Sequence, residues 1–246
     1  SDVCSSDLDG WEPVWDYSLI RPEGTWLHTK GGRASGPDPL RQLLETTHRI
    51  IRGAAGRSLR PFEIHRLATL CGSIVQVGGV RRAAEICLFD PTDTEMATCK
   101  TGPFWEAYPE LAMANNSMVF EGPLDEDSIS TLVGQLARTG TGEPGIFRQD
   151  GFIPERRVRR SFGTNPCGEI ILRSRQFCNL SIAVARPTDT LETLTSKVQL
   201  AALIGTIQSC LTTFRYLSTD WKTNSEEERL LGVDITGALD CPILQP

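Results

Sequence analysis

The chain has 246 residues, of which 39% are apolar and 23% charged, a composition typical of one large globular domain or two small ones. Its formal net charge of −6 gives no basic surface for DNA or RNA, so no nucleic-acid partner is expected. No apolar run approaches the roughly 20 residues that span a bilayer, and no secretory signal opens the chain, so no membrane partner is expected.

The eight cysteines do not follow the spacing of a disulfide-rich or zinc-binding protein. There is no Cys-x-x-Cys and no paired set of His and Cys ligands. The three histidines, His28, His48 and His65, do not stand in a Ser/His/Asp-like context. These features favour a cytoplasmic protein in a reducing compartment, with no metal bound by its own side chains.

The two ends of the chain predict an internal piece of a longer protein. Residues 1–8, SDVCSSDL, are similar to the in-frame translation of a sequencing adapter, so we treat them and Cys4 as non-native. The chain stops at residues 241–246 without a closing element. Residues 9–246 are therefore expected to form the native part.

Turns and helices dominate the first half of the predicted elements. Residues 11–36 predict a short strand followed by turns, and Asp38 is a candidate helix cap. Apolar residues at helical spacing predict helices over 40–51 and 61–75, the second with Ile64, Leu67, Cys71 and Ile74 on one face. A turn at 77–82 precedes a strand at 84–89.

The second half continues the alternation of strands and helices. Strands are predicted at 111–120 and 231–236, and a capped amphipathic helix at 125–138. The longest predicted helix, 191–217, directs a set of side chains toward a core: Leu194, Val198, Ala201, Ile204, Cys210, Leu211 and Phe214. Alternating strands and helices indicate an α/β fold, as a barrel or a doubly wound sheet.

Residues 163–169, Gly-Thr-Asn-Pro-Cys-Gly-Glu, carry most of the functional information. They place an amide (Asn165), a thiol (Cys167) and a carboxylate (Glu169) at alternate positions, which face the same way in an extended segment. Pro166 restrains that geometry. Cys178 follows 11 positions after Cys167, so a returning strand would bring the second sulfur near the first.

This block, together with Phe177-Cys-Asn-Leu180, closely resembles the active-site loop of ribonucleotide reductases. The short spacing of the two cysteines is most similar to the adenosylcobalamin-dependent (class II) enzymes, since class I enzymes tend to place more residues between them. Further blocks occur in the order expected for the family: Gly31-Gly-Arg-Ala-Ser-Gly-Pro37, Val77-Gly-Gly-Val-Arg-Arg-Ala-Ala-Glu85, Ala114-Asn-Asn-Ser117, Gly142-Glu-Pro-Gly-Ile-Phe147 and Glu226-Glu-Glu-Arg-Leu-Leu-Gly-Val233.

The resemblance implies a fold, a reaction and partners. It implies part of a ten-stranded α/β barrel with the active-site cysteine on a central loop. It also implies reduction of ribonucleotides, as triphosphates, to deoxyribonucleotides for DNA synthesis, with adenosylcobalamin as the cofactor. The implied partners are the ribonucleotide substrate, a deoxynucleotide effector and a thioredoxin-like or small dithiol reductant.

The resemblance also implies a role for each residue of the loop. Cys167 would form the thiyl radical and Glu169 would be the general base on the 3′-hydroxyl. Asn165 would hold the substrate hydroxyls, and Cys178 would be one of two reducing cysteines. The neighbouring Gly163, Thr164, Pro166 and Gly168 are candidate substrate contacts.

Two other segments are candidate nucleotide contacts through the same resemblance. One corresponds to the family's loop that relays effector identity to the substrate base, and comprises Gly78, Gly79, Val80, Arg81, Arg82 and Ala83. The arginines offer planar forks of donors, although a plain turn with a solvated pair explains the sequence too. The other comprises Ser35 and Gly36, which a helix-entry turn would also explain.

Several alternatives stay open. The chain could belong to a class I catalytic subunit, a non-catalytic nucleotide-binding homologue or a degraded phage gene. In the family, the second reducing cysteine and the C-terminal shuttle cysteines would lie outside this segment; inside it, only Cys87 competes. The segment is expected to be inactive by itself and, as part of a barrel, to aggregate or stay molten.

Overall fold

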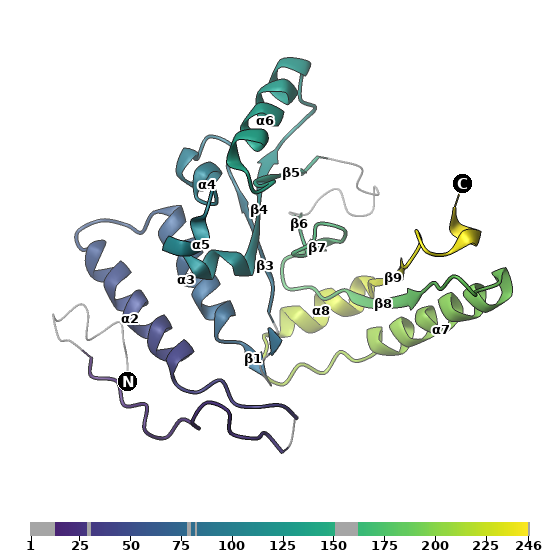
Figure 1. Cartoon of the computed structure of the whole chain (residues 1–246), viewed down its shortest axis with the longest axis horizontal. Coiled ribbons are helices and arrows are strands. Elements are labelled where there is room, and N and C mark those ends of the chain that lie inside the picture. The colour runs from purple at the N-terminus through teal and green to yellow at the C-terminus, as the bar shows by residue number, and fades with distance from the viewer. Residues whose placement is uncertain (1–12, 29–30, 78–79, 82, 151–161, 246) are drawn as a thin grey trace. The chain divides into compact units, whose positions relative to one another are not determined.

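The computed structural model describes residues 13–28, 31–77, 80–81, 83–150 and 162–245 (Figure 1). It divides into two compact units, Ser1–Ile153 and Pro154–Pro246. None of the helices in these ranges combines the length and the apolar character needed to cross a membrane.

The first unit begins with two helices, α2 (Asp38–Gly53) and α3 (Pro61–Ser73). Helix α3 starts with a proline at its first position, where no backbone donor is needed. The Glu63 carboxylate accepts a hydrogen bond from the Arg60 backbone N–H (2.9 Å) and forms an ion pair with Arg57 (2.7 Å). These contacts stabilise the first turn of α3.

A parallel sheet of three strands forms the centre of the first unit. Its order is β3 (Glu85–Phe89), β4 (Ala114–Phe120) and β5 (Gly145–Arg148). The connections contain α4 (Thr94–Thr98), α5 (Phe104–Ala107), the 3-10 helix η1 (Pro109–Met113) and α6 (Glu126–Thr139). Helical crossovers of this kind are what parallel neighbours require. The core consists of Phe62, Phe89, Met96, Leu111, Met118 and Leu132.

The second unit combines a hairpin with a parallel strand pair. Strands β6 (Phe162–Thr164) and β7 (Ile171–Arg173) are antiparallel, whereas β8 (Asn179–Val184) pairs in parallel with β9 (Leu231–Thr236). Helices α7 (Leu191–Ser209) and α8 (Thr219–Glu228) connect β8 to β9, and a short 3-10 helix, η3 (Pro242–Leu244), follows.

Helix α7 packs along both strands of that pair (Figure 1). Small side chains make the contact, because Ala201, Gly205 and Ser209 are buried at helical spacing. A methyl group at Gly205 would lie only 2.9 Å from Leu231 Cδ1 and 3.3 Å from Ser181 Oγ. The backbone of α7 therefore approaches the strands more closely than a larger residue allows.

Most predicted elements are confirmed, with changed boundaries. The α/β class is confirmed, and α2, α3, β3, α6 and β9 lie where the sequence predicts them. Asp125 caps α6 by accepting a hydrogen bond from Ser128 N (2.7 Å). The ten-stranded barrel stays a prediction, since the described strands form sheets of two or three strands.

Two predictions about elements are wrong, and two further predicted elements are shorter than expected. Residues 13–28 and 31–36 contain no strand, only an isolated bridge between Trp26 and Arg33. Asp38 is the first residue of α2 rather than its cap, and it pairs with Arg41 (3.2 Å). The predicted strand at 111–120 begins only at Ala114, after a 3-10 turn. The helix predicted over 191–217 ends at Ser209, and α8 follows unpredicted.

The faces assigned to two helices also need correction. On α3, Ile64 and Cys71 are exposed, and the buried face contains Phe62, His65, Thr69 and Leu70 instead. On α7, Leu194 and Ala201 are buried as predicted, whereas Ile204 is exposed. Cys210 and Leu211 lie beyond the end of α7 and are exposed as well. In both helices, polar or small residues occupy the buried face, so apolar spacing alone assigns it wrongly.

Candidate functional site

The Asn-Pro-Cys-Gly-Glu segment is the tight turn of the β6–β7 hairpin. Gly168 N donates to Asn165 O (3.0 Å), which closes a β-turn with Pro166 and Cys167 at its centre. Proline suits the second position of such a turn, and Gly168 adopts the positive φ (+87°) that favours glycine. The prediction of an extended segment with alternating side chains is therefore wrong. A β-turn, rather than the alternation of a strand, sets the directions of these side chains.

Asn165 organises the turn through its backbone and its side chain. Its backbone N–H donates to Ile170 O (3.1 Å), and its Oδ1 accepts from Ile170 N (3.0 Å). Thr164 Oγ1 lies 3.3 Å from the same Oδ1. The amide oxygen is thus used within the protein, whereas the two N–H donors of Nδ2 have no partner among the described residues.

The turn presents its thiol and its carboxylate on the surface of the second unit. Cys167, Gly168 and Glu169 are exposed, whereas Gly163, Thr164, Asn165 and Pro166 are half-buried. An exposed thiol next to an exposed carboxylate is accessible to a substrate. The half-buried residues of the hairpin form the base that supports this turn.

Cys178, half-buried, immediately precedes β8. Burial raises the pKa of its thiol, and the negative charge of Glu169 raises that pKa further. A hydrogen bond from the Gly232 backbone N–H acts in the opposite direction and lowers the pKa. Glu169 is therefore near enough to Cys178 for its charge to act on the thiol, while the predicted approach of Cys178 to Cys167 stays a prediction.

A cavity of about 250 Å³ adjoins Cys178. Its lining comes from three places in the second unit: the segment before β8, the end of α7 with the loop after it, and α8. Asn179 lies on its wall and donates through Nδ2 to Leu230 O (2.9 Å). Sequence reasoning missed the contributions of Ser209, Thr212 and Ser225, because no motif marks them.

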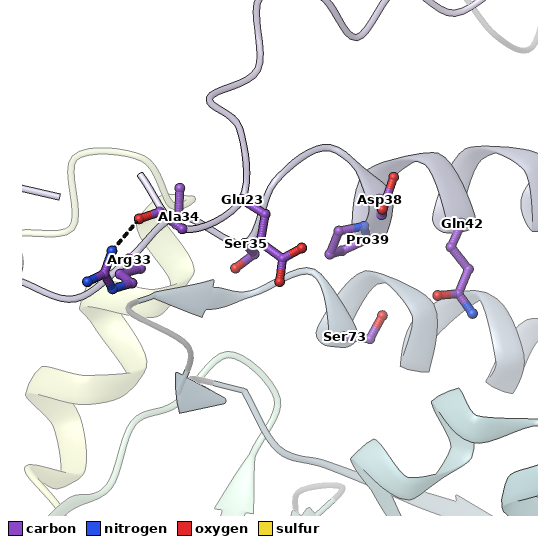
Figure 2. Close-up of a pocket in the computed structure, with 9 residues that line it drawn as sticks. Glu23, Arg33, Ala34, Ser35, Asp38, Pro39, Gln42 and Ser73 are labelled. Carbon is purple, nitrogen blue, oxygen red and sulfur yellow. Dashed lines mark hydrogen bonds between the residues drawn. The ribbon is translucent and has the colours of Figure 1, made fainter. Parts of the chain in front are cut away.

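A second, larger cavity lies in the first unit and includes Ser35. It measures about 490 Å³ and is lined by the N-terminal loop, the start of α2 and the end of α3 (Figure 2). The Ser35 hydroxyl is buried without a hydrogen-bond partner among the described residues. Gly36 has a positive φ (+75°), and a methyl group there would lie 3.0 Å from Glu23 Cβ. Ser35 therefore lines the cavity, whereas the backbone conformation of Gly36 gives a local structural reason for a glycine.

The predicted effector loop is only partly described. Residues Gln76–Val77 (β1) pair antiparallel with Val80–Arg81 (β2), so the chain reverses direction here as predicted. Gly78, Gly79 and Arg82 lie outside the described residues. Ala83 is half-buried.

Cys87, the other cysteine considered as a reductant, lies on β3 of the first unit. Burial raises its pKa to about 11, with smaller contributions from Asp93 and Glu85. A thiol of this kind reacts slowly at neutral pH. Within the described ranges, no group of three His, Cys, Asp or Glu side chains has the arrangement of a metal site.

Comparisons with known proteins found similarity to one kind of enzyme. The adenosylcobalamin-dependent ribonucleoside-triphosphate reductase of Lacticaseibacillus paracasei is 30% identical over 239 residues, which cover 92% of this chain and 31% of the relative. The Levilactobacillus brevis enzyme of the same name is 33% identical over 172 residues, covering 68% of this chain and 23% of the relative. A probable enzyme of this type from Dictyostelium discoideum is 27% identical over 241 residues (92% and 30%).

No family model and no solved structure matches the chain. The chain spans about a third of the length of the Lacticaseibacillus paracasei enzyme, and the similarity covers the hairpin turn within its sequence. The chain is a homologue of a segment of the adenosylcobalamin-dependent ribonucleoside-triphosphate reductases.

Proposed function

We propose that this chain is the part of a ribonucleoside-triphosphate reductase that carries the radical cysteine and one reducing cysteine. The observation that carries the proposal is the Asn-Pro-Cys-Gly-Glu turn, which exposes Cys167 and Glu169 on one hairpin and whose Glu169 charge acts on the Cys178 thiol. A thiol, a carboxylate and a second thiol in one small region match the needs of ribose 2′-reduction. The names of the homologous enzymes support the same substrate and cofactor.

The donor set of the turn fits a reaction partner of adenosylcobalamin. The Cys167 thiol is exposed at the tip of a turn whose backbone is fixed, so a bound cofactor could approach it. The cofactor, when bound, supplies the radical that protein side chains do not generate unaided. Cys167 is the residue of this chain that would meet it.

Each residue of the turn then has a distinct part in the reaction. Cys167, as a thiyl, removes the 3′ hydrogen of the ribose and returns it at the end. Glu169 accepts the proton of the 3′-hydroxyl and gives it back. Asn165 donates to the substrate hydroxyls through Nδ2, since its oxygen is engaged by Ile170.

Cys178 completes the chemistry by supplying a proton and electrons. Its thiol protonates the 2′-hydroxyl, which leaves as water. The hydrogen of a second cysteine fills the vacated 2′ position, and the two cysteines, having provided two electrons in total, end as a disulfide. An external dithiol restores the thiols by exchange, which fits a thioredoxin-like or small dithiol partner. The raised pKa of Cys178 favours its protonated form, which a proton donor requires.

The remaining candidate contacts extend the proposal to the nucleotide. Val80, Arg81 and Ala83, with the neighbouring residues outside the described part, correspond to the loop that would respond to a deoxynucleotide effector. Ser35 lines the cavity of the first unit, and it and the adjoining Gly36 would contact substrate. The product, a deoxyribonucleoside triphosphate, serves DNA synthesis.

The test is an assay of the full-length gene product with each ribonucleoside triphosphate and diphosphate, a dithiol, and adenosylcobalamin present or absent. We expect cofactor-dependent deoxynucleotide formation that disappears in Cys167→Ala. Product formed only with an added radical-generating subunit would assign the protein to class I. No product under any condition would favour a non-catalytic nucleotide-binding protein.

A further inference from the structure

We propose that helix α8 is the positioning element for Cys178, and that Asn224 and Glu228 hold the segment between the two cysteines in its working geometry. This inference rests on the proposed function. The contacts that carry it form one group, the α8 clamp: Asn224, Glu227 and Glu228 on the helix, with Arg173 and Gln176 on the segment that they hold.

Arg173, the last residue of β7, is the centre of the α8 clamp. Its side chain is 4% exposed, and its guanidinium lies 2.7 Å from Glu227 Oε2 and 3.6 Å from Glu228 Oε2. It also donates to the Asn224 backbone oxygen (2.9 Å). A buried cation near the C-terminal end of a helix is favoured by the helix dipole as well as by the carboxylates.

Gln176 ties the next part of the segment to the same helix. Its Oε1 accepts from the Arg173 backbone N–H (2.9 Å), and its Nε2 donates to Glu228 and to the Asn224 backbone oxygen (3.3 Å). In the opposite direction, Asn224 Nδ2 donates to Ser174 O (2.9 Å). The side chains of Gln176 and Asn224 therefore both form hydrogen bonds with the backbone at the end of β7 and in the turn after it.

Phe177, the neighbour of Cys178, is held by aromatic packing. Its ring centroid lies 4.9 Å from that of Phe214 and 4.7 Å from that of Trp221 on α8. On the C-terminal side of Cys178, β8 begins with Asn179, which pairs with Leu231 of β9. Cys178 thus lies in the chain between a residue held by aromatic packing and a residue held by strand pairing.

This arrangement has a chemical purpose in the proposed reaction. Cys167 must reach the 3′ carbon and Cys178 the neighbouring 2′-hydroxyl, so the two sulfurs have to keep a set separation. Errors of about 1 Å in such an arrangement can lower a rate on the order of 100-fold. The clamp bonds the short segment that joins the two cysteines. Asn224 and Glu228 therefore act through Cys178 as positioning residues.

The test uses the full-length protein with Asn224→Ala and Glu228→Ala, together with two comparison variants. Glu228→Gln keeps an oxygen acceptor for Gln176, and Lys222→Ala removes an exposed side chain from the same helix. The first readout is the alkylation rate of Cys178 relative to Cys167 in the cofactor-free protein, followed by mass spectrometry. The second is the separation of kcat from KM.

We expect Asn224→Ala and Glu228→Ala to raise the alkylation rate of Cys178 several-fold with that of Cys167 unchanged. The kcat should fall about 10- to 100-fold with little change in KM. Glu228→Gln should retain most of the activity, and Lys222→Ala all of it. Alkylation rates of both cysteines that rise together, or a Cys178 rate that does not change, would overturn the proposal. An active Cys167→Ala enzyme would instead refute the proposed function, while the alkylation result would still decide whether α8 holds Cys178.

Discussion

The negative charge of Glu169 acts on the thiol of Cys178 and, after burial, contributes to the rise in its pKa. Glu169 stands on the tip of a hairpin and Cys178 before the next strand, so the relationship links two separate elements. The same carboxylate that is proposed as a base thus also favours the protonated form of the Cys178 thiol.

Replacing Glu169 by Gln should lower the pKa of Cys178, because the thiolate would no longer face a negative charge. The pH dependence of Cys178 alkylation in the cofactor-free protein measures this, and its midpoint should move to lower pH. Glu192→Gln, in the first turn of α7, is the matched control. A midpoint that stays at the wild-type pH in Glu169→Gln would show that burial alone sets the pKa.

Asn165→Asp should separate the structural role of Asn165 from its role toward substrate. The aspartate keeps an oxygen for Ile170 N, so protection of that amide from hydrogen exchange should persist. It lacks the Nδ2 donors, so substrate binding should weaken, by about 1 kcal/mol or more. Asn165→Ala should lose both properties. Equal loss of Ile170 protection in the two variants would contradict this division of roles.

His65 should make the first unit less stable at mildly acidic pH. Burial, with a smaller contribution from the charge of Lys100, lowers its pKa to about 4. The unfolded state, with a histidine pKa of about 6.5, binds a proton that the native state does not. The free energy of unfolding should therefore fall by up to about 3 kcal/mol as the pH drops from about 6.5 to 4. His65→Gln should flatten this dependence, measured by hydrogen exchange of α3 in the full-length protein with correction for intrinsic rates. An unchanged slope would assign it to other groups.

Two glycine-to-alanine changes in helices should have opposite effects. Gly205→Ala should destabilise the second unit by about 1–3 kcal/mol, because the new methyl group meets Leu231 Cδ1 at 2.9 Å. Gly134→Ala on α6 meets only Arg138 Nη1 at 3.4 Å, so it should stabilise its helix by up to about 1 kcal/mol. Limited proteolysis of the full-length protein reports both. Stabilisation in both variants would mean that Leu231 moves away from the new methyl group without lowering the stability of the second unit.

The chain on its own should bind a hydrophobic dye and unfold without a sharp transition. Leu200, Leu203, Ile204 and Ile207 of α7 are each more than half exposed and lie within two helical turns. Apolar patches of this kind promote association. Replacing Leu203 by Glu should reduce dye binding, whereas Glu192→Gln should not. A cooperative thermal transition of the monomeric chain would contradict the expectation.

The sequence was informative where local chemistry determines the structure. Helix α6 was predicted because Asp125 and the apolar spacing after it both define a capped helix. The approach of Cys178 to Cys167, which the motif and the short spacing predict, stays a prediction. The turn itself was predicted with the wrong geometry, since Pro166 and Gly168 favour a β-turn over the extended form that alternation suggested.

The parts that the sequence did not reveal depend on contacts between distant residues. Helix α8 reads as Thr-Asp-Trp-Lys-Thr-Asn-Ser-Glu-Glu-Glu, whose polar residues show no apolar periodicity. It is identifiable only through partners such as Arg173, which lies 54 positions before Glu227. The buried face of α3 was missed for a similar reason, because His65 and Thr69 belong to it.

Gln176 leaves the ribosome well before its partner on α8, since 52 positions separate it from Glu228. At roughly 5–20 residues per second, that delay lasts several seconds. Until then, the segment beside Cys178 has no helix to hold it, and the thiol is open to oxidation or to a wrong partner. In the nascent chain, Cys178 therefore becomes protected only after α8 has been made. Ribosome pauses inside the α7–α8 coding region would lengthen that exposure.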